Sequence, residues 1–289
     1  MTDYLIILAG GASSRMKKSS SNVLSKNSTE QANSRSKALI LINDRPMLDY
    51  VLSNAKQAGF KNIYIVVGKD DVLFKTYYGK QRSGNTFHGL TISFVYQHIP
   101  QGRIKPFGTA DAVCQALEQY SNLQKCQFVV CNCDNLYSVK AFELLRKSTH
   151  SNAFINYDRD ALQYSLERIQ RFALTKTTPK KFLVDIIEKP QLELLDVFKD
   201  DEGKFRVSMN IFLFDGIMFY PFLKDCEIHP KRNEKELPTA ILKMIEEYSD
   251  SMQGIPLAEH VPDLTAKTDI HTMKEYLLKH EFKVDWFKK

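Results

Sequence analysis

The sequence predicts an α/β fold in which a mixed, mainly parallel sheet is layered against flanking helices. Strand-like and helix-like segments alternate through most of the chain, and the first strand runs into a glycine pair, a loop and then a helix. Hydrophobic residues make up 43% of the 289 residues, which is enough to bury a large core. We expect one domain over residues 1–289, with its chemistry in the loops that follow the strands, because ligands bind outside the carboxyl ends of parallel strands.

The elements follow in order along the chain. An apolar strand spans 4–8, and a helix spans 46–58, where Pro46 suits the first helical turn and Gly59 suits a stop. Further strands are predicted over 62–67, 91–96, 127–131, 153–157, 182–187 and 205–214, and further helices over 109–120, 139–147, 234–247 and 269–280. Because parallel strands need long crossover connections, this alternation favours parallel pairing.

Composition excludes several classes of protein. The 40 basic and 34 acidic side chains leave a net charge of +6, but both signs are scattered along the chain, which suits a small anionic substrate better than nucleic acid. No apolar run approaches the ~20 residues that span a bilayer, so we expect no membrane segment. The five cysteines are odd in number and form no CxxC pair, which predicts free thiols in a reducing cytoplasm and neither disulfides nor a zinc site.

Residues 17–36 depart from the average composition. They contain seven serines and three asparagines, with Val23, Leu24 and Ala32 as their apolar side chains. Such a segment buries too little apolar surface to form a packed element alone, so we expect a flexible Ser/Asn/Lys-rich loop inserted in the domain. It is either a solvated insertion or a lid that becomes ordered when an anionic ligand binds.

The loop after the first strand has the composition of a phosphate cradle. Residues 8–16 have the sequence LAGGASSRM, in which Gly10 and Gly11 permit close backbone approach while Ser14 and Arg15 add donors and positive charge. The pattern is neither the dinucleotide GxGxxG fingerprint nor the GxxxxGK[ST] P-loop. A plain tight turn is the alternative interpretation.

Together with SKALILINDRPMLDYVL over 36–52, this loop resembles the start of nucleotidyltransferases of the sugar-nucleotide pyrophosphorylase superfamily. The resemblance implies the Rossmann-like fold of nucleotide-diphospho-sugar transferases, with Arg15 and Lys37 as catalytic cations. The implied triphosphate cradle consists of Leu8, Ala9, Gly10, Gly11 and Ser14. This chain has Ser13 or Ser14 where the family has a glycine, Ser36 where it has a proline, and a longer spacing between Arg15 and Lys37. The SSRM sequence also resembles the molybdenum-cofactor and isoprenoid-pathway nucleotidyltransferases.

Two later motifs resemble the base-binding and metal-binding elements of the superfamily. Gln97 and the PFGTADAV sequence, with Gly108 and Thr109, imply contacts with the nucleotide base, although Thr109 could equally cap a helix. Asp134 ends an apolar strand and resembles the family's metal-binding aspartate, with Cys133 in place of glycine. Asp263 in DLTAKTDI resembles the second ligand, so the implied metal is Mg²⁺, and Asp269 is a helix cap or a first-turn charge. Ala266 and Lys267 replace the usual Thr-Pro.

The motifs for the second substrate complete the resemblance. Glu188 and Lys189 precede a proline, as in the family's EKP motif, which implies contacts with sugar hydroxyls and with the sugar phosphate. Ser208 and Asn210 fall in a strand that lines the sugar pocket of the family, where Asn210 replaces a typical glycine. An exposed charged turn is the alternative interpretation for Glu188 and Lys189.

The ordered series of motifs implies a cytoplasmic, Mg²⁺-dependent enzyme that joins a nucleoside triphosphate to a sugar 1-phosphate, giving a nucleotide sugar and pyrophosphate. Its implied partners are these two small molecules, with no nucleic acid and no membrane. Three alternatives stay open. The acceptor could be a phosphocholine-type or molybdenum-cofactor-type phosphate, the chain could be a non-catalytic nucleotide-binding module, or it could be a basic nucleic-acid-binding protein. The base, the sugar and the oligomeric state, homo-oligomer or monomer, are not determined by the sequence.

Overall fold

The computed structural model describes residues 1–21, 23–69, 72–187, 198–284 and 286. The chain forms two compact units. Unit 1 consists of residues 1–2, 107–131 and 143–261, and unit 2 consists of residues 3–106, 132–142 and 262–289. Because each unit is assembled from separate stretches of chain, no single linker marks a boundary between them. Within the described residues, no helix has both the length and the apolar character needed to cross a bilayer.

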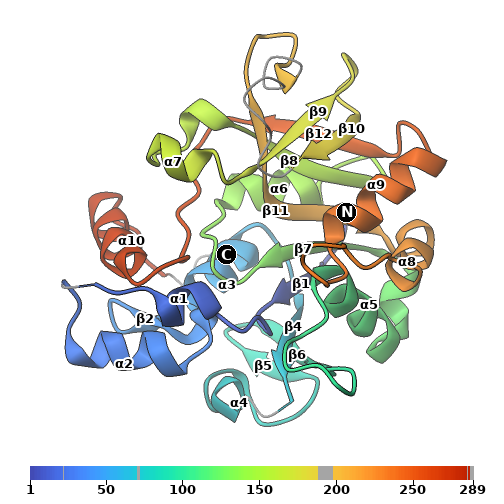
Figure 1. The fold of residues 1–289 in the computed structure, drawn as a ribbon. Helices are drawn as coiled ribbons and strands as arrows, with labels where there is room; N and C mark the ends of the chain where they lie inside the picture. Colours follow the sequence, from blue (N-terminus) through green and yellow to red (C-terminus); the bar gives the residue numbers. More distant parts are fainter. Residues whose placement is uncertain (22, 70–71, 188–197, 285, 287–289) are drawn as a thin grey trace. The chain divides into compact units, whose positions relative to one another are not determined.

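Unit 2 contains a sheet in the strand order β1-β4-β6-β5 (Figure 1). β1 (Tyr4–Leu8), β4 (Asn62–Gly68) and β6 (Leu90–Gln97) are parallel, and β5 (Asn85–Phe87) pairs antiparallel with β6. β1 and β4 are almost continuous apolar runs, and their central side chains are buried, as expected for strands covered on both faces. In this register Leu8 pairs with Val66 and Gly68 pairs with Gln97. The loop after β1 and Gln97 are therefore at the same edge of the sheet.

The remaining elements of unit 2 are mostly helices. They are α1 (Ser14–Lys18), α2 (Lys26–Ser34), the 3₁₀ turn Lys37–Leu39, the short strands β2 (Leu41–Ile42) and β3 (Arg45–Pro46), α3 (Met47–Gln57), α4 (Val72–Tyr78) and α10 (Thr268–Lys279). α3 begins directly after Pro46 and ends just before Gly59, whose φ of 96° is the left-handed conformation of a helix stop. The predicted helix and its stop at Gly59 are therefore confirmed, whereas Pro46 lies just outside the first helical turn, as the N-cap residue at the end of β3.

The segment 17–36 differs from the sequence prediction, because it contains α2 in place of a continuous loop. The Ser25 side chain accepts a hydrogen bond from the Ser28 amide and caps this helix, and Ala32 is fully buried. Gln31 Oε1 accepts a hydrogen bond from the Leu41 amide at 3.0 Å. Polar side chains thus supply packing contacts that the low apolar content of residues 17–36 did not predict. Movement of this segment as a lid stays a prediction.

Unit 1 is organised around β11 (Arg206–Asp215), which pairs antiparallel with β7 (Gln127–Asn132), β8 (Asn152–Asp158) and β9 (Ala173–Thr177). β9 lies beside residues 206–208 and β7 beside residues 211–215, and the β8 register is irregular between Ser208 and Phe212. β10 (Leu183–Ile187) pairs antiparallel with β9, and β12 (Met252–Leu257) runs parallel to β8. β11 therefore changes one neighbour at residues 209–210.

The helical elements of unit 1 are α5 (Thr109–Gln119), the 3₁₀ turns Ser121–Lys125 and Arg159–Ala161, α7 (Leu166–Ile169), α8 (Gly216–Lys224) and α9 (Leu237–Glu247). One further helix, α6 (Val139–Arg146), begins in unit 2 and ends in unit 1. The predicted fold class, a mixed sheet flanked by helices, is confirmed. Parallel pairs dominate in unit 2, whereas antiparallel pairs surround β11 in unit 1.

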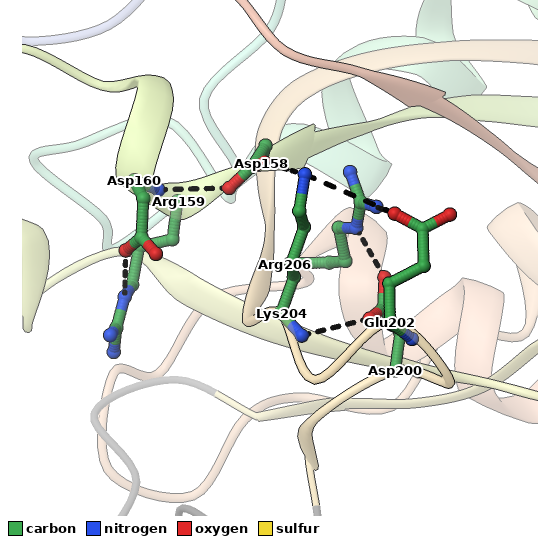
Figure 2. A network of polar contacts seen from close by, with 7 residues as sticks. All are labelled: Asp158, Arg159, Asp160, Asp200, Glu202, Lys204 and Arg206. Carbon is green, nitrogen blue, oxygen red and sulfur yellow. Dashed lines mark hydrogen bonds and ion pairs between the residues drawn. The ribbon is translucent and has the colours of Figure 1, made fainter.

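A polar network fixes the start of β11 (Figure 2). Arg206, with its side chain only 6% exposed, contacts Asp200 at 2.6 Å and Glu202 at 3.3 Å. Lys204 contacts Asp158 at 2.9 Å. Burial works against ionisation of Asp158 and Asp200, but the hydrogen bonds from Lys204 and Arg206 outweigh it and hold the pKa of each carboxyl below its usual range. Ionised partners thus stabilise the turn that leads into β11.

This network predicts that part of the free energy of unfolding is lost at acidic pH. A lowered folded pKa stabilises the folded state above the unfolded pKa of about 3.9, and this contribution is lost as the pH falls through the folded value. Arg206→Met leaves the Asp200 carboxylate, which is 18% exposed, without its main partner and is expected to cost about 2–4 kcal/mol near pH 7, and less below pH 4. Urea unfolding of the wild type and of Arg206→Met between pH 7 and pH 4 and below measures the difference in their free energies of unfolding.

The control is Arg171→Met, which removes an exposed ion pair with Glu167 and should cost under about 1 kcal/mol. An Arg206→Met penalty that does not change with pH would contradict the assignment.

Candidate functional site

The loop after β1 lies directly against the end of β6 in unit 2. The Ala9 amide donates a hydrogen bond to the Val66 carbonyl at 2.9 Å, which continues the β1–β4 ladder by one residue. A Cβ atom on Gly10 would lie 3.0 Å from Gln97 Oε1, closer than nine in ten real Cβ contacts. A side chain at position 10 would therefore crowd Gln97. The structure thus brings together two residues that the sequence predicted separately for nucleotide binding.

Ser13 holds a backbone conformation that usually belongs to glycine. Its φ of 53° and ψ of 30° are left-handed, and it forms the N-terminal boundary of α1. The left-handed residue is Ser13 and not Ser14, because Ser14 is the first residue of the helix. The turn keeps the geometry of a glycine motif despite the substitution. It places Arg15 on α1 as an exposed cation that forms no ion pair within the described part of the chain.

Lys37 and Asp134 form the most direct contact among the predicted residues. Lys37 Nζ lies 2.7 Å from Asp134 Oδ2, and the two side chains are only 11% and 19% exposed. Ser36, which stands where the family has proline, donates its hydroxyl to the Ala9 carbonyl at 3.1 Å. This bond attaches the Lys37 segment to the loop after β1. The predicted catalytic lysine and the predicted metal ligand are thus neighbours.

Asp263 lies beside Asp134 because two stretches of backbone pair with each other. The Leu264 amide donates to the Asp134 carbonyl at 2.9 Å, and the Leu136 amide donates to the Pro262 carbonyl at 2.8 Å. Asn135 and Asp263 form an antiparallel bridge between these bonds. The Thr265 hydroxyl donates to Asp263 Oδ2 at 2.9 Å. The two aspartates predicted as metal ligands therefore come from adjacent backbone segments.

The loop that carries Asp263 is fixed at its other end by Asp269. Asp269 Oδ2 accepts hydrogen bonds from the Thr265 amide at 2.8 Å and the Ala266 amide at 2.6 Å. Asp269 lies in the first turn of α10, where a negative charge also favours the helix dipole. The expected first-turn charge is thus confirmed, and the carboxylate has the further task of holding the loop before the helix.

The donor set at Asp134 and Asp263 fits Mg²⁺. This ion is bound by one or two carboxylates and shares its remaining positions with water and substrate phosphates. Across the described residues no group of three or more His, Cys, Asp and Glu side chains is arranged to hold a metal. A set of two carboxylates beside a phosphate-type loop suits an ion that arrives with a phosphate ligand. The Lys37 ammonium provides positive charge at Asp134 in this structure.

Cys133 replaces a family glycine directly before Asp134 without adding a reactive group. Its amide donates to the Leu8 carbonyl at 3.4 Å, which joins this segment to the end of β1. Burial raises the pKa of the Cys133 thiol, and the nearby Asp134 charge raises it further. The thiol is therefore neutral at physiological pH. All five cysteines are free, so the predicted absence of disulfides is confirmed.

Gly108 and Thr109, predicted for base binding, belong to unit 1 and connect two of its helices. Gly108 has a φ of 113°, and a Cβ atom there would lie 2.2 Å from the Lys235 carbonyl oxygen. Thr109 Oγ1 accepts a hydrogen bond from the Leu237 amide at 2.9 Å, at the first residue of α9. The close approach that requires glycine is thus made by protein backbone. Thr109 serves the start of α9, and a role for either residue in base binding stays a prediction.

Asn210 occupies the point where β11 changes neighbours. Its φ is 57°, again the left-handed region that glycine favours. Asn adopts this conformation more readily than other residues with a side chain, which explains how it replaces the family glycine. Ser208 is buried, and its hydroxyl accepts a hydrogen bond from the Asn210 amide at 3.3 Å. Glu188 and Lys189 lie outside the described residues.

Lys267, which was not predicted from the sequence as a site residue, lies next to the Asp263 loop. Its side chain is buried in unit 2 and reaches the backbone at the end of α1. A sequence signal for this residue was present, because a lysine replaces an apolar family residue between the two aspartates at 263 and 269.

A cavity of about 960 Å³ in unit 1 lies between α8 and α9. Met218, Phe222 and Leu242 are among its lining residues, and none of the predicted site residues lines it.

Comparisons with known proteins test the family resemblance. The profile of the nucleotidyl transferase family matches residues 4–257. The chain is 24% identical over 263 residues to the bifunctional protein GlmU of Staphylococcus haemolyticus (strain JCSC1435). The aligned residues cover 89% of this chain and 48% of that protein. It is 26% identical over 187 residues to glucose-1-phosphate thymidylyltransferase of Neisseria meningitidis serogroup A / serotype 4A (strain DSM 15465 / Z2491), covering 64% of this chain and 55% of that protein.

The fold is shared with a solved structure. The crystal structure of UDP-glucose pyrophosphorylase complexed with UDP-glucose matches with a TM-score of 0.68 and 14% identity, over 97% of this chain and 100% of that chain. The chain spans about half the length of the curated relatives that it matches. The family profile covers the loop after β1, Lys37 and Asp134, and it ends before Asp263. By this match over most of its length, the chain belongs to the nucleotidyl transferase family.

Proposed function

We propose that this protein is a sugar-1-phosphate nucleotidylyltransferase. The observation that carries the proposal is the cluster in unit 2, where Lys37 pairs with Asp134 beside Asp263 and close to the loop after β1. A cation, two carboxylates and a glycine turn at one edge of a parallel sheet are the groups that a metal-bound triphosphate requires. The names of the relatives support hexose 1-phosphate as the second substrate.

The proposed reaction is an in-line displacement. A phosphate oxygen of the sugar 1-phosphate attacks the α-phosphorus of the triphosphate, the new P–O bond forms, and the bond to the bridging oxygen of the leaving pyrophosphate breaks. The nucleophile is already an anion near neutral pH, so the site needs no general base. The protein therefore acts by positioning the two phosphates and by stabilising the charge that builds up between them.

Each cation and donor has a proposed task. The exposed Arg15 binds the leaving pyrophosphate, and Lys37 binds the α-phosphate. The backbone of Leu8, Ala9, Gly10 and Gly11, with Ser14, surrounds the triphosphate, and Gln97 binds the base beside Gly10. Mg²⁺ held by Asp134 and Asp263 would neutralise phosphate charge. Because Lys37 contacts Asp134, binding of substrate requires this ammonium to be shared between the carboxylate and the phosphate.

The residues of unit 1 have proposed tasks toward the second substrate. Glu188 and Lys189 bind the sugar hydroxyls and the sugar phosphate, Ser208 and Asn210 line the sugar site, and Gly108 and Thr109 contribute to base recognition. We further propose that the enzyme acts in the cytoplasm, which its free cysteines favour. Two other functions are tested by the same experiments. One is a transferase with a phosphocholine-type or cofactor-type acceptor, and the other is a binding module without turnover.

The first prediction concerns activity and its two cations. A screen of the common nucleoside triphosphates against hexose 1-phosphates and phosphocholine, with Mg²⁺, should release pyrophosphate with at least one hexose 1-phosphate. Lys37→Met and Arg15→Met should each lower the turnover by about 10²–10³, as removal of a preorganised charge donor does. Pyrophosphate release by coupled assay measures both effects.

The matched control is Lys61→Met, which removes a lysine of unit 2 whose side chain is 71% exposed. Its turnover should equal that of the wild type. Turnover with phosphocholine alone would support the other acceptor class, and triphosphate binding without release would support the binding module. Near-normal turnover in both Lys37→Met and Arg15→Met would overturn the proposed roles.

The second prediction concerns the metal. Chelation of divalent ions should abolish activity, and Mg²⁺ should restore it. Asp134→Asn and Asp263→Asn should each raise the Mg²⁺ concentration needed for half-maximal rate and lower the maximal rate, because an amide is a weaker ligand than a carboxylate. Asp160→Asn changes a carboxylate that is 75% exposed in unit 1 and should leave the Mg²⁺ dependence unchanged. An unchanged Mg²⁺ titration in both site variants, with folding verified by circular dichroism, would refute the metal assignment.

A further inference from the structure

Lys267 is a buried lysine whose three hydrogen bonds all go to one short stretch of chain, residues 17–19. The residue is 6% exposed. Its ammonium donates to the Lys17 carbonyl at 3.2 Å and to the Ser19 carbonyl at 2.5 Å. Its backbone amide donates to the Ser19 hydroxyl at 2.9 Å. A buried ammonium requires such partners, because burial without them strongly disfavours the charge.

The receiving backbone is the end of α1, the helix that carries Arg15. The Ser19 amide donates to the Arg15 carbonyl at 3.0 Å, and the Ser19 hydroxyl donates to the Met16 carbonyl at 2.9 Å. Carbonyls at a helix end lack partners inside the helix, and a cation there is favourable toward the helix dipole. Lys267 therefore acts as a C-terminal cap for α1, supplied by a residue 250 positions away from Lys17.

The same lysine belongs to the loop that carries Asp263. Asp269 fixes this loop through the Thr265 and Ala266 amides, and Lys267 is the next residue. The start of α10 and α1 thus approach each other in unit 2 (Figure 1). A continuous set of contacts runs from the Asp134 segment to the Asp263 loop, then through Lys267 to α1.

We propose that Lys267 is a positioning residue that ties α1 to the Asp263 loop and so holds Arg15 and the root of the 17–36 insertion in place for the triphosphate. The expected effect of Lys267 on catalysis rests on the proposed function. Its structural part, the clamp on α1, stands on the contacts alone. Proline, the family residue that Lys267 replaces, has neither an amide hydrogen nor a side-chain donor, so it could make none of these three bonds.

The clamp also explains why a long insertion is tolerated here. The 17–36 segment begins at the carbonyls that Lys267 holds, and Ser36 is bonded to the Ala9 carbonyl at its other end. Both ends of the insertion are therefore fixed to the loop system of the site. Extra residues between fixed ends add only a slowly growing entropy cost.

The test compares Lys267→Met with Lys267→Arg, and uses Lys279→Met as control. Methionine keeps an unbranched apolar stem but removes the charge, and arginine keeps the charge. Lys279 is an exposed lysine at the far end of α10, the helix that follows Lys267. Hydrogen exchange of the amides of residues 15–20 is measured first, because it needs no activity. We expect Lys267→Met to raise exchange there by about tenfold or more, with Lys267→Arg close to wild type.

Steady-state kinetics of pyrophosphate release supply the second readout. We expect Lys267→Met to raise KM for the triphosphate or to lower kcat by about tenfold or more, with substantial rescue in Lys267→Arg. Faster unfolding with unchanged exchange at 15–20, or with both KM and kcat unchanged, would mean a merely structural lysine and would overturn the proposal. If Lys267→Met does not fold, Lys267→Gln, which removes the charge but keeps a polar side chain, replaces it in both measurements with the same expected direction.

The two proposals fail in different ways. A wild-type protein that releases no pyrophosphate with any substrate pair overturns the proposed function, and the exchange of residues 15–20 then decides the clamp by itself. A wild-type enzyme that is active, with Lys267→Met indistinguishable from Lys279→Met in exchange and in KM, overturns the clamp and leaves the proposed function intact.

Discussion

The candidate site depends on the ion pair between Lys37 and Asp134. Two charges that are mostly removed from water cost several kcal/mol each to desolvate, so they persist only where their surroundings fix both partners. Asp134 is fixed by backbone bonds to the Asp263 loop, and Lys37 by the neighbouring Ser36 hydroxyl on the Ala9 carbonyl. The loop after β1 and the Asp263 loop are thereby attached to the two sides of the same charge pair.

The backbone conformation and the hydrogen bonds of the replacing residues explain several departures from the family pattern. Ser13 and Asn210 stand at glycine positions, and both keep the left-handed backbone that glycine would adopt. Ser36 replaces a proline and exchanges a fixed φ for a hydroxyl that bonds to a neighbouring loop. At Ser13 and Asn210 the left-handed backbone is present although the residue is not glycine. A sequence comparison counts these positions as differences, although the turns they form are maintained.

The sequence was sufficient for most of the strands and for the end of α3, because both leave local signals. Strong apolar runs located β1, β4 and β6 to within two residues, and Gly59 marked the end of α3. It was insufficient for α2, whose packing uses Gln31 and serine caps instead of an apolar face, and for β9 and β12, whose pairing depends on distant partners. The sequence marked Lys267 only as a departure from the family pattern, and its contacts could not be predicted because its side-chain acceptors are backbone carbonyls that carry no sequence signature.

The discontinuity of unit 2 has a consequence for biosynthesis. The residues that hold Asp134 and Lys267 in place come from stretches of chain at 3–106, 132–142 and 262–289. A ribosome adds about 5–20 residues per second, so the Asp263 loop emerges several seconds or more after β1, α1 and Lys37. Until then Asp134 lacks the backbone segment 262–264 that bonds to it, and α1 lacks its cap. A nascent chain therefore exposes an incomplete set of charges, and the site can assemble only once synthesis has passed residue 269.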